Sequence, residues 1–444
     1  MVLSLTVLGA GPKAIAVQAK AHALRCLGIS KAEILVLDPL GVGGNWLSDG
    51  GWTNGRHLLG TSPLKDIGFP YNTRIAGHEA GSSLGILNRK VDRELFQVSW
   101  IQFLIETNRY TSWVDRGHPS PLHRLWAEYL NWAAERIDLK LLSGRVDRIS
   151  VCGEELTRWS LSVQLNDGST HDVVSEALMI TGPGTSSRCI ADLPQVYSLA
   201  RFWRAAGEGS LPEMDRVAVI GGGESAASVV NELVRYPCKE IKVISPAATI
   251  FSRGESQFEN RLYSEPARWL ALDEAARRDV ISRTDRGVFS VRVQEFLQSD
   301  DRVLHLRGKA ETVEGRGEFV VISISDTALG TRQESFDLVV DARGNNPLWF
   351  TQLMDDDVRE LLAGACGGTL RLSGVEERVG ADLALEGVVP KLFLPMLSGL
   401  RQGPGFANLS CLGELSDRIL AGMGVGTLPG DILDADRRSA GRQK

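Results

Sequence analysis

The sequence has no uninterrupted apolar stretch of about 18 residues and no long run of basic residues. The first absence argues against a membrane-spanning helix. The second absence, with acids and bases well mixed and a net charge of −6, argues against nucleic acid or an anionic membrane surface as a partner. The first residues also lack the charged and apolar regions of a signal peptide, so we expect a cytoplasmic protein that binds small molecules.

Cysteine pairs and metal-ligand spacings are missing as well. The six cysteines lie far apart without a C-x-x-C pair, which argues against a zinc site and a disulfide framework and predicts buried, reduced thiols. The seven histidines show no metal-ligand spacing, so no metal site is expected. No G-x-S-x-G motif is present, which leaves the serine-hydrolase class without support.

Glycine, by contrast, is abundant, with 47 among the 444 residues. Hydrophobic residues make up 43% of the chain, so it can bury a large core, and its length predicts two or three domains. An apolar run at 3–8, helical spacing at 12–27 and a strand pattern at 33–38 form a βαβ opening. The sequence therefore predicts a parallel α/β sheet.

The next part of the chain changes character. Residues 41–116 are irregular and rich in Gly, Trp and polar residues, and long irregular segments in α/β proteins usually line a site. A capped amphipathic helix is predicted at 120–136. Further strands are predicted at 141–151, 158–164 and 177–184.

Two glycine loops, GAGPKA at 9–14 and GGGESA at 221–226, each follow a predicted strand and open a predicted helix. In such a loop the first glycine permits a tight turn, the second lets a pyrophosphate approach the backbone, and a small third residue packs helix on strand. A lone match is weak, but two copies in the same context predict two bound dinucleotides. The predicted contacts are Gly9, Gly11 and Ala14 in the first loop and Gly221, Gly223, Ser225 and Ala226 in the second.

Other residues lie where a bound nucleotide would need them. Asp38 ends the second predicted strand, where its carboxylate can accept a hydrogen bond from a ribose 2′-OH. The segment GVGGNW at 41–46 gives backbone room beside the same nucleotide, and the strand ends in ITGPG and DARGNNP resemble crossing points between domains. These segments predict cofactor contacts at Gly44, Asn45, Trp46, Gly182 and Gly344.

Two facing dinucleotides suggest a redox pair, with a flavin kept in the first unit and a nicotinamide visiting the second. A disulfide reductase would need a cysteine pair after the second strand, and none is present. A Baeyer–Villiger oxygenase would carry a Phe-Gly-His-Trp pattern before the second loop, but residues 193–207 contain no histidine. An oxygen-activating amine hydroxylase remains. The predicted fold is α/β, with two Rossmann-like dinucleotide-binding domains, for FAD and NAD(P)H, and a smaller substrate-binding region.

The expected domains follow from these units. Residues 1–205 form the first part of the FAD domain, and 206–345 form the NAD(P)H domain, in which an insertion at 247–290 contributes to the substrate site. Residues 346–430 return to the FAD and substrate domain. The polar residues 431–444 are expected to be a disordered tail.

Six segments, spread from about residue 3 to about 423, carry a family resemblance. They resemble the N-hydroxylating flavin monooxygenases that oxidise the side-chain amine of lysine or ornithine for siderophores. Within that family the chain looks most like the actinobacterial lysine N6-hydroxylases of mycobactin-type and nocobactin-type pathways. The segments are VLGAGPKAIAV, GGWTNGRHLLGTSPLKDIGFPY, MITGPG, RVAVIGGGESAAS, RTDRGVFS and KLFLPMLSGLRQGPGFANLSCLGELSDRIL.

The resemblance implies a reaction cycle. NAD(P)H would reduce FAD, oxygen would add at the flavin C4a position, and the lysine N6 amine would attack the hydroperoxide while NADP+ stays bound. The amine must be neutral to attack. With an ordinary pKa of about 10.4, roughly one lysine in a thousand is neutral near pH 7.5, a handicap of about 4 kcal/mol. A dry pocket and nearby cations would lower that pKa.

The resemblance also implies a substrate site. In the S-x-x-K-D segment, Lys65 would hold the carboxylate of the amino acid through a charge-assisted hydrogen bond. Asn260 corresponds to the family's substrate asparagine. The segment ELSDRIL, which lies near the flavin in the family, nominates Ser416 for substrate binding and Leu415 for cofactor binding. Cofactor contacts are further implied at Val146 and Asn408.

Several positions depart from the wider family pattern. Asp285 stands where ornithine hydroxylases usually carry asparagine, and Gly60 stands where they carry glutamine, five residues before the lysine. The basic residue expected to clamp the NADPH 2′-phosphate is replaced by Pro246, with Arg253 the nearest substitute. We assign both Asp285 and Arg253 to cofactor binding and leave the choice between NADPH and NADH open.

Two alternatives stay open. One is an N-hydroxylase of ornithine, of another diamine, or of a lysine already acylated or assembled into the siderophore. The other is a non-catalytic flavin or nicotinamide-binding protein that senses redox state. The expected partners are L-lysine and molecular oxygen, and the sequence leaves open whether the protein is a homo-oligomer.

Overall fold

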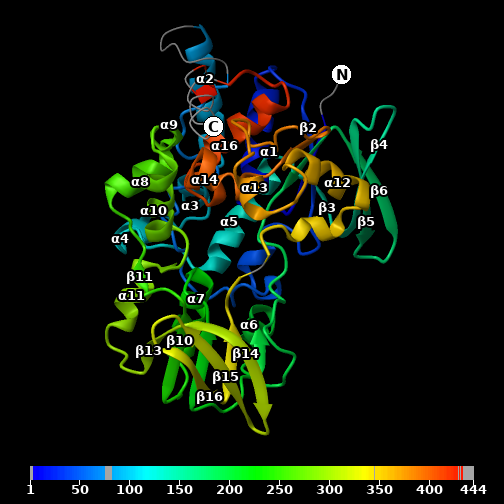
Figure 1. Cartoon of the computed structure of the whole chain (residues 1–444). Coiled ribbons are helices and arrows are strands. Elements are labelled where there is room, and N and C mark those ends of the chain that lie inside the picture. Colours follow the sequence, from blue (N-terminus) through cyan, green and yellow to red (C-terminus); the bar gives the residue numbers. More distant parts are fainter. Residues whose placement is uncertain (1–3, 76–82, 345, 429, 431, 434–444) are drawn as a thin grey trace.

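Two five-stranded parallel sheets organise the molecule (Figure 1), and they confirm the predicted α/β class with two Rossmann-like units. The computed structural model describes residues 4–75, 83–344, 346–428, 430 and 432–433. Apart from residues 432 and 433, the tail expected to be disordered lies outside the described residues. Within the described residues, no helix is both long and apolar enough to cross a membrane.

The first sheet has the strand order β18-β7-β1-β2-β3, and all of its neighbours pair in parallel. Helices α1 (Pro12–Cys26) and α16 (Leu412–Gly422) pack together, joined by a buried ion pair of 2.6 Å between Lys20 and Asp417. The N-terminal and C-terminal parts of the described chain therefore meet in this unit. Its strands are β1 (Ser4–Leu8), β2 (Glu33–Leu37), β3 (Lys140–Leu142), β7 (Ala177–Ile180) and β18 (Lys391–Phe393).

The second sheet has the order β13-β10-β9-β17-β8, again all parallel. Its edge strand β8 lies before the domain division expected at 205/206, and helix α6 (Leu199–Glu208) crosses that division. Helix α6 buries Phe202 and Trp203 in the core of the second unit. The strands are β8 (Val196–Ser198), β9 (Arg216–Ile220), β10 (Glu240–Ser245), β13 (Val303–Arg307) and β17 (Leu338–Asp341).

Both units follow the same chain plan. Each contains a strand, a glycine loop, a helix (α1, or α7, Glu224–Leu233) and a parallel strand, and later passes through a three-stranded antiparallel sheet. In the second unit, β8 and α6 come before this series. A parallel strand, β7 or β17, then returns beside the first strand. The antiparallel strands lie on the right of Figure 1 for the first unit and at the bottom for the second. They are β4 (Gly144–Cys152), β5 (Arg158–Leu165), β6 (Thr170–Ser175), β14 (Lys309–Arg316), β15 (Phe319–Asp326) and β16 (Gly330–Phe336).

The segment expected to be irregular contains three helices, so that prediction was wrong for its second half. Helix α2 spans Ser83–Phe96, α3 spans Trp100–Glu106 and α4 spans Tyr110–Asp115. Ser99 caps α3 by accepting a hydrogen bond from the backbone N–H of Gln102. Two short 3-10 turns, Gly44–Trp46 and Ser48–Gly50, lie in the first half.

Helix α5 (His123–Arg136) begins later than predicted. Its N-cap is Leu122, which offers no side-chain cap, because the hydroxyl of Ser120 donates instead to the carbonyl of Thr61 at 3.3 Å. The expected cap therefore ties this helix to the loop before Lys65 rather than to its own first turn.

A helical insertion separates β10 from β13 and lies on the left of Figure 1. The short strands β11 (Phe251–Ser252) and β12 (Val288–Phe289) pair in parallel and so join the early part of the insertion to its later part. Its helices are α8 (Gln257–Ser264), α9 (Pro266–Leu270), α10 (Glu274–Thr284) and α11 (Val291–Leu297). Near the C-terminus follow a 3-10 turn (Trp349–Leu353), α12 (Asp356–Ala365), α13 (Leu372–Glu376), a second 3-10 turn (Pro395–Leu397), α14 (Gly399–Gln402) and α15 (Pro404–Ala407).

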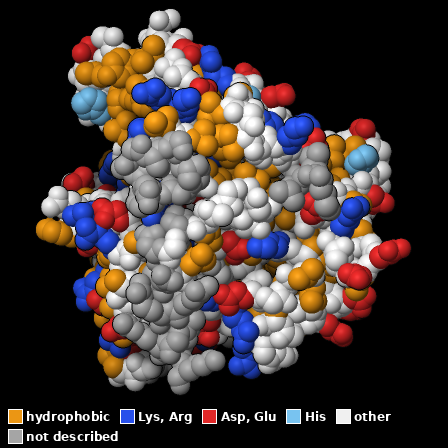
Figure 2. Space-filling model, turned by 90° about the horizontal axis from the view of Figure 1, so that it is seen from above, with side chains coloured by type: hydrophobic (Ala, Val, Ile, Leu, Met, Phe, Trp, Pro, Cys, Tyr) orange, Lys and Arg blue, Asp and Glu red, His pale blue; other side chains and the backbone are white. Residues whose placement is uncertain are grey.

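The surface and the thiols agree only partly with the expectations. On the face shown in Figure 2, the described Lys and Arg side chains are interspersed with Asp and Glu rather than gathered in one basic patch. All six cysteines are free. Cys238 and Cys411 are buried as predicted, but Cys26 and Cys189 are exposed.

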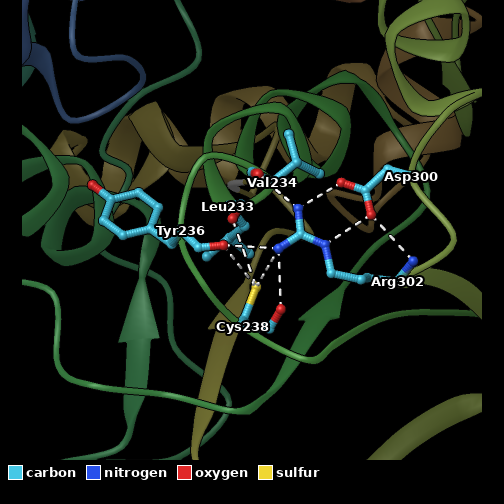
Figure 3. Close-up of polar contacts among 6 residues, drawn as sticks. All are labelled: Leu233, Val234, Tyr236, Cys238, Asp300 and Arg302. Atoms are coloured by element: carbon cyan, nitrogen blue, oxygen red, sulfur yellow. Dashed lines mark hydrogen bonds and ion pairs between the residues drawn. The ribbon is translucent and has the colours of Figure 1, made fainter.

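One arginine closes the end of helix α7 (Figure 3). The guanidinium of Arg302 donates to the carbonyl oxygens of Val234, Tyr236 and Cys238 at 2.7–3.0 Å, and it is held by the carboxylate of Asp300 at 2.6 Å. Val234 is the C-cap of α7, and Tyr236 and Cys238 follow it, so these bonds hold the turn that ends the helix.

Replacing Arg302 with alanine is therefore expected to lower the free energy of unfolding by about 1–3 kcal/mol, because several carbonyls lose their donor. Urea unfolding followed by circular dichroism measures the change. Arg302→Lys should recover only part of it, since an ammonium cannot reach all three carbonyls in the same plane. Equal stability of the alanine variant and the wild type would contradict this account of the helix end.

Candidate functional site

Two adjoining cavities, of about 300 and 880 Å³, open at the first glycine loop. They share lining residues at the ends of β1, β2 and β7, so together they form one elongated space. An extended dinucleotide binds at this edge of a doubly wound sheet, where the strand order reverses. The shared residues are Gly9, Asp38, Asn45, Thr181 and Gly182.

The first glycine of each loop is fixed by close packing against the neighbouring strand. Gly9 has φ +102°, and a Cβ there would lie 2.4 Å from the hydroxyl of Thr181, which follows β7. Gly221 has φ +136°, and a Cβ there would lie 2.7 Å from the carbonyl of Ala342, which follows β17. Any side chain is excluded at both positions, and the two units share this constraint.

The second glycine of the first loop leaves open space instead. A Cβ on Gly11 would meet no atom within 4 Å. Gly11 also lies at the N-cap of α1, where free backbone N–H groups and the helix dipole favour an anion. In the same cavity wall, the buried indole N–H of Trp52 has no partner among the described residues. These features fit a phosphate-bearing cofactor.

Asp38 holds the loop as well as facing the cavities. One carboxylate oxygen accepts from the N–H of Ala10 and the other from the N–H of Leu40, both at 2.8 Å. The side chain borders both cavities. The predicted bond to a ribose hydroxyl would therefore use lone pairs that these two amides leave free.

Lys13 brings a cation into the smaller of these cavities, which the sequence reasoning did not assign. Its ammonium donates to the carbonyl of Ala407 at 2.9 Å, and the side chain is 8% exposed. Burial lowers the pKa of Lys13 to about 8, while the nearby carboxylate of Asp285 opposes the shift. A lysine in the middle of a glycine loop was the available signal.

A third cavity, of about 170 Å³, brings together two residues that are far apart in the sequence. The ammonium of Lys65 donates to the side-chain oxygen of Asn260 at 2.8 Å and lies 3.5 Å from the hydroxyl of Ser410. Ser410 is adjacent in the chain to Leu409, which lines the smaller of the two adjoining cavities. These two cavities, at the first glycine loop, are the flavin-type cavities. The loop that contains Leu409 and Ser410 therefore borders both a flavin-type cavity and the third cavity.

The insertion fixes the orientation of Asn260. Its side-chain N–H donates to the carbonyl of Glu255 at 2.7 Å, which turns the amide oxygen towards Lys65. Ser256 and Glu259 form a capping box that holds the start of α8. Arg253 lines the same cavity, and its contact with the NADPH phosphate stays a prediction.

The charge balance of the third cavity favours an anion. Lys65, Arg253 and Arg292 line it, together with the single carboxylate of Glu255. Burial lowers the pKa of Lys65, the neighbouring Arg253 lowers it further, and Glu255 opposes both effects. A carboxylate ligand would restore the balance by pairing with these cations.

The aspartate next to Lys65 is structural. Asp66 is 2% exposed and accepts from the N–H groups of Trp100 (2.9 Å) and Gly68 (3.1 Å) and from the hydroxyl of Tyr71 (2.8 Å). It thus fixes the turn that presents Lys65. Burial raises the pKa of Asp66 to about 6, against the effect of these hydrogen bonds.

Asp66→Ala is expected to lower the free energy of unfolding by about 2–4 kcal/mol at neutral pH, because buried donors lose their acceptor. Since the folded-state pKa is raised, the folded protein binds the proton more tightly than the unfolded chain. The contribution of Asp66 should therefore fall as the pH rises from about 4 to about 6. Urea unfolding across this range tests it. The exposed Asp115 offers a control, since Asp115→Ala should change neither quantity.

Asp285 is the C-cap of helix α10. Burial raises the pKa of Asp285, and the cations of Arg253, Arg286 and Lys13 oppose the shift. Arg253 belongs to the third cavity and Lys13 to the smaller flavin-type cavity, so Asp285 lies within electrostatic reach of both.

Some predicted residues lie outside the linings of these three cavities. Leu415 and Ser416 are fully buried in α16, and the Ser416 hydroxyl donates to the carbonyl of Leu412 at 2.8 Å. The side-chain amide N–H group of Asn408 is buried without a partner among the described residues. Also outside these linings are Ala14, Gly221, Gly223, Ser225, Ala226, Asp285 and Gly344.

The other predicted contacts do border the cavities. The smaller flavin-type cavity also contains Gly11, Gly44 and Trp46, and the larger one contains Val146. His123 was missed: it lines the smaller cavity and hydrogen-bonds with the hydroxyl of Thr53 at 2.9 Å. Burial lowers the pKa of His123 to about 4, so the imidazole is neutral at physiological pH.

Two Rossmann-like units beside a cavity lined by three cations are typical of an oxidoreductase that uses two dinucleotides. The family model for L-lysine 6-monooxygenase/L-ornithine 5-monooxygenase matches residues 96–304. The chain is 47% identical over 431 residues to the L-lysine N6-monooxygenase MbtG of Mycobacterium tuberculosis, covering 96% of this chain and 95% of that protein. The chain therefore belongs to the family of flavin-dependent N-hydroxylating monooxygenases, as the resemblance predicted.

Solved structures agree with this assignment. The lysine monooxygenase NbtG from Nocardia farcinica, described with an unprecedented NADPH domain conformation, is 48% identical and superposes with a TM-score of 0.82, covering 94% of this chain and 98% of that one. The ornithine N-hydroxylase of Kutzneria sp. 744 is 16% identical, with a TM-score of 0.70 over 96% and 99% of the two chains. The second likeness concerns the fold alone.

Proposed function

We propose that the protein hydroxylates the N6 amine of L-lysine with FAD, NADPH and molecular oxygen, and supplies N6-hydroxylysine for a hydroxamate siderophore. The observation that carries the proposal is the meeting of Lys65, Asn260 and Arg253 in a cavity next to the flavin-type cavities. Relatives named L-lysine N6-monooxygenase, at 44–47% identity, support lysine as the substrate.

FAD would occupy the two adjoining cavities, with its pyrophosphate at Gly9 and Gly11, its ribose at Asp38 and its far end near Val146. Bound FAD supplies the oxygen-activating chemistry. The C4a-hydroperoxide, the preference for NADPH at the second glycine loop, and the cytoplasmic location stay predictions.

The chain itself would bind and orient the amino acid. The Lys65 ammonium would pair with the α-carboxylate, and Asn260, held by the carbonyl of Glu255, would fix its direction. With the α-carboxylate held in place, the length of the side chain decides how close its amine comes to the flavin. Lysine and ornithine differ by one methylene, so the fixed carboxylate lets the site distinguish the two amino acids by length.

The experiment is a product analysis with the FAD-loaded protein, NADPH, oxygen and one amine at a time. L-Lysine should give N6-hydroxylysine, detected by chromatography and mass spectrometry. L-Ornithine, cadaverine and Nα-acetyl-lysine are assayed in the same way. If one of them has a larger kcat/KM than L-lysine, that compound replaces lysine as the proposed substrate. If the rate of NADPH oxidation is the same with and without each amine, and no hydroxylamine forms, a redox-sensing protein would be favoured instead.

A further inference from the structure

The third cavity carries both signs of charge, and one residue supplies its negative charge. Lys65, Arg253 and Arg292 bring three cations to the lining, whereas Glu255 is the single carboxylate among the lining residues. The three cations suit an α-carboxylate. Glu255 has no place in that contact, because its carboxylate would repel the same group. A ligand that uses the whole lining must therefore also carry a positive charge.

Glu255 borders the cavity where it meets solvent. Its side chain is 40% exposed, whereas Lys65 and Asn260 are half-buried. Among the described residues, the carboxylate of Glu255 makes no hydrogen bond, and its ion-pair partner is the Nε of Arg253 at 4.0 Å. An exposed ion pair at that distance is weak. The carboxylate can therefore accept hydrogen bonds from a ligand without giving up a strong contact.

The main chain of Glu255 joins it to the residues that would hold the substrate carboxylate. Its carbonyl accepts from the side-chain N–H of Asn260 at 2.7 Å, and the amide oxygen of Asn260 accepts from the Lys65 ammonium at 2.8 Å. Lys65, Asn260 and Glu255 therefore form one hydrogen-bonded series. It brings a positive and a negative side chain to the same cavity from segments that are far apart in the sequence.

The head of a free amino acid carries the matching pair of charges. Its carboxylate and its ammonium are attached to one carbon, so a site that binds both must offer a cation and an anion close together. Acylation of the α-nitrogen replaces the ammonium by a neutral amide with a single N–H. Such a substrate would leave the Glu255 carboxylate without a charged partner.

We propose that Glu255 binds the α-ammonium of the substrate and so restricts the enzyme to lysine whose α-nitrogen is free. This inference rests on the proposed lysine hydroxylation and adds a residue that determines its specificity. Lys65 would recognise one charged group of the amino acid head, and Glu255 would recognise the other. The reaction that acylates the α-nitrogen must then follow hydroxylation rather than precede it.

The first test compares ligands on the oxidised, FAD-loaded wild type by titration calorimetry. L-Lysine carries both charged groups of the head, whereas 6-aminohexanoate lacks the α-ammonium and keeps the carboxylate and the chain length. 6-Aminohexanoate should bind about tenfold more weakly than lysine, because it cannot use Glu255. Equal affinities for the two ligands would overturn the proposal.

The second test repeats these titrations with Glu255→Gln, which keeps the shape of the side chain and the main-chain bond to Asn260. Lysine binding should weaken about tenfold while 6-aminohexanoate binding changes little, so that the preference for lysine disappears. The matched control is Glu274→Gln in the same insertion. The Glu274 side chain is 45% exposed and lines none of the three cavities, so both affinities should equal those of the wild type.

6-Aminohexanoate also separates a direct contact from an indirect effect. The negative charge of Glu255 opposes the lowering of the Lys65 pKa, so its removal also acts on the cation that would hold the α-carboxylate. An effect through Lys65 would weaken the binding of lysine and of 6-aminohexanoate equally, since both carry the carboxylate. Equal losses for the two ligands in Glu255→Gln would therefore overturn the proposal.

A second variant and a turnover measurement complete the test. If Glu255→Gln does not hold FAD, Glu255→Ala should lose the preference for lysine in the same way, and an unchanged preference in it would contradict the proposal. Hydroxylation of Nα-acetyl-lysine with the same kcat/KM as lysine would support N6 hydroxylation but overturn the role of Glu255. A preference for lysine that depends on Glu255, without any hydroxylysine from the wild type, would support the contact and overturn the proposed reaction.

Discussion

Replacing Lys65 with alanine is expected to raise the KM for L-lysine by about 100-fold while FAD remains bound and reducible by NADPH. Lys65 supplies the ammonium that meets Asn260 in the third cavity, and no other described side chain donates to Asn260 at that point. Losing a partially buried charge pair costs about 2–5 kcal/mol, which corresponds to a factor of about 30 or more. Steady-state product formation measures KM, and stopped-flow absorbance measures reduction.

The control for Lys65→Ala is a change of substrate rather than of residue. Cadaverine lacks the α-carboxylate, so whatever turnover it supports should respond little to the loss of Lys65. A KM for lysine that stays at the wild-type value would remove Lys65 from the substrate site. An equal loss for lysine and cadaverine would show that the substitution damages the site in general.

Gly11→Ala is expected to weaken FAD binding by about 10- to 100-fold without destabilising the protein that lacks the cofactor. The added methyl group meets no protein atom within 4 Å, so the fold has room for it. The same space is where the pyrophosphate would approach the backbone, and crowding there costs about 1–3 kcal/mol. Flavin fluorescence during titration with FAD gives the affinity, and thermal unfolding of the cofactor-free form gives the stability.

Gly9→Ala is the matched variant with the opposite expected pattern. Its methyl group would lie 2.4 Å from the Thr181 hydroxyl, at a residue with φ +102°. The cofactor-free protein should lose about 3 kcal/mol or more of stability. If the two variants instead lost stability equally, the empty space beside Gly11 would not belong to a cofactor.

The sequence predicted the parts of the fold that local patterns decide. Strand, glycine loop and helix follow one another within about 25 residues, so the openings of both units could be recognised. The second half of 41–116 could not, because α2 and α3 are short amphipathic helices interrupted by polar residues. Their burial depends on packing against distant segments rather than on their own pattern.

The site was harder to predict than the fold. Lys65, Asn260 and Ser410 meet although about 150 or more residues separate each from the next, and residue composition alone gave no reason to join them. The family resemblance selected Lys65 and Asn260, but not Lys13 or Glu255. Arg253 was predicted to contact the cofactor phosphate from its position after β10, and no sequence signal indicated that it also lines the third cavity, next to the β11–β12 pair.

The central claim is that the flavin-type cavities and the Lys65 cavity serve one reaction, in which oxygen is transferred to the side-chain nitrogen of lysine. Turnover of L-lysine with NADPH under ¹⁸O₂, followed by mass spectrometry of the amino acid product, tests it most directly. We predict N6-hydroxylysine that carries one ¹⁸O atom. Consumption of NADPH and oxygen with unlabelled, unmodified lysine as the only amino acid recovered would contradict the account.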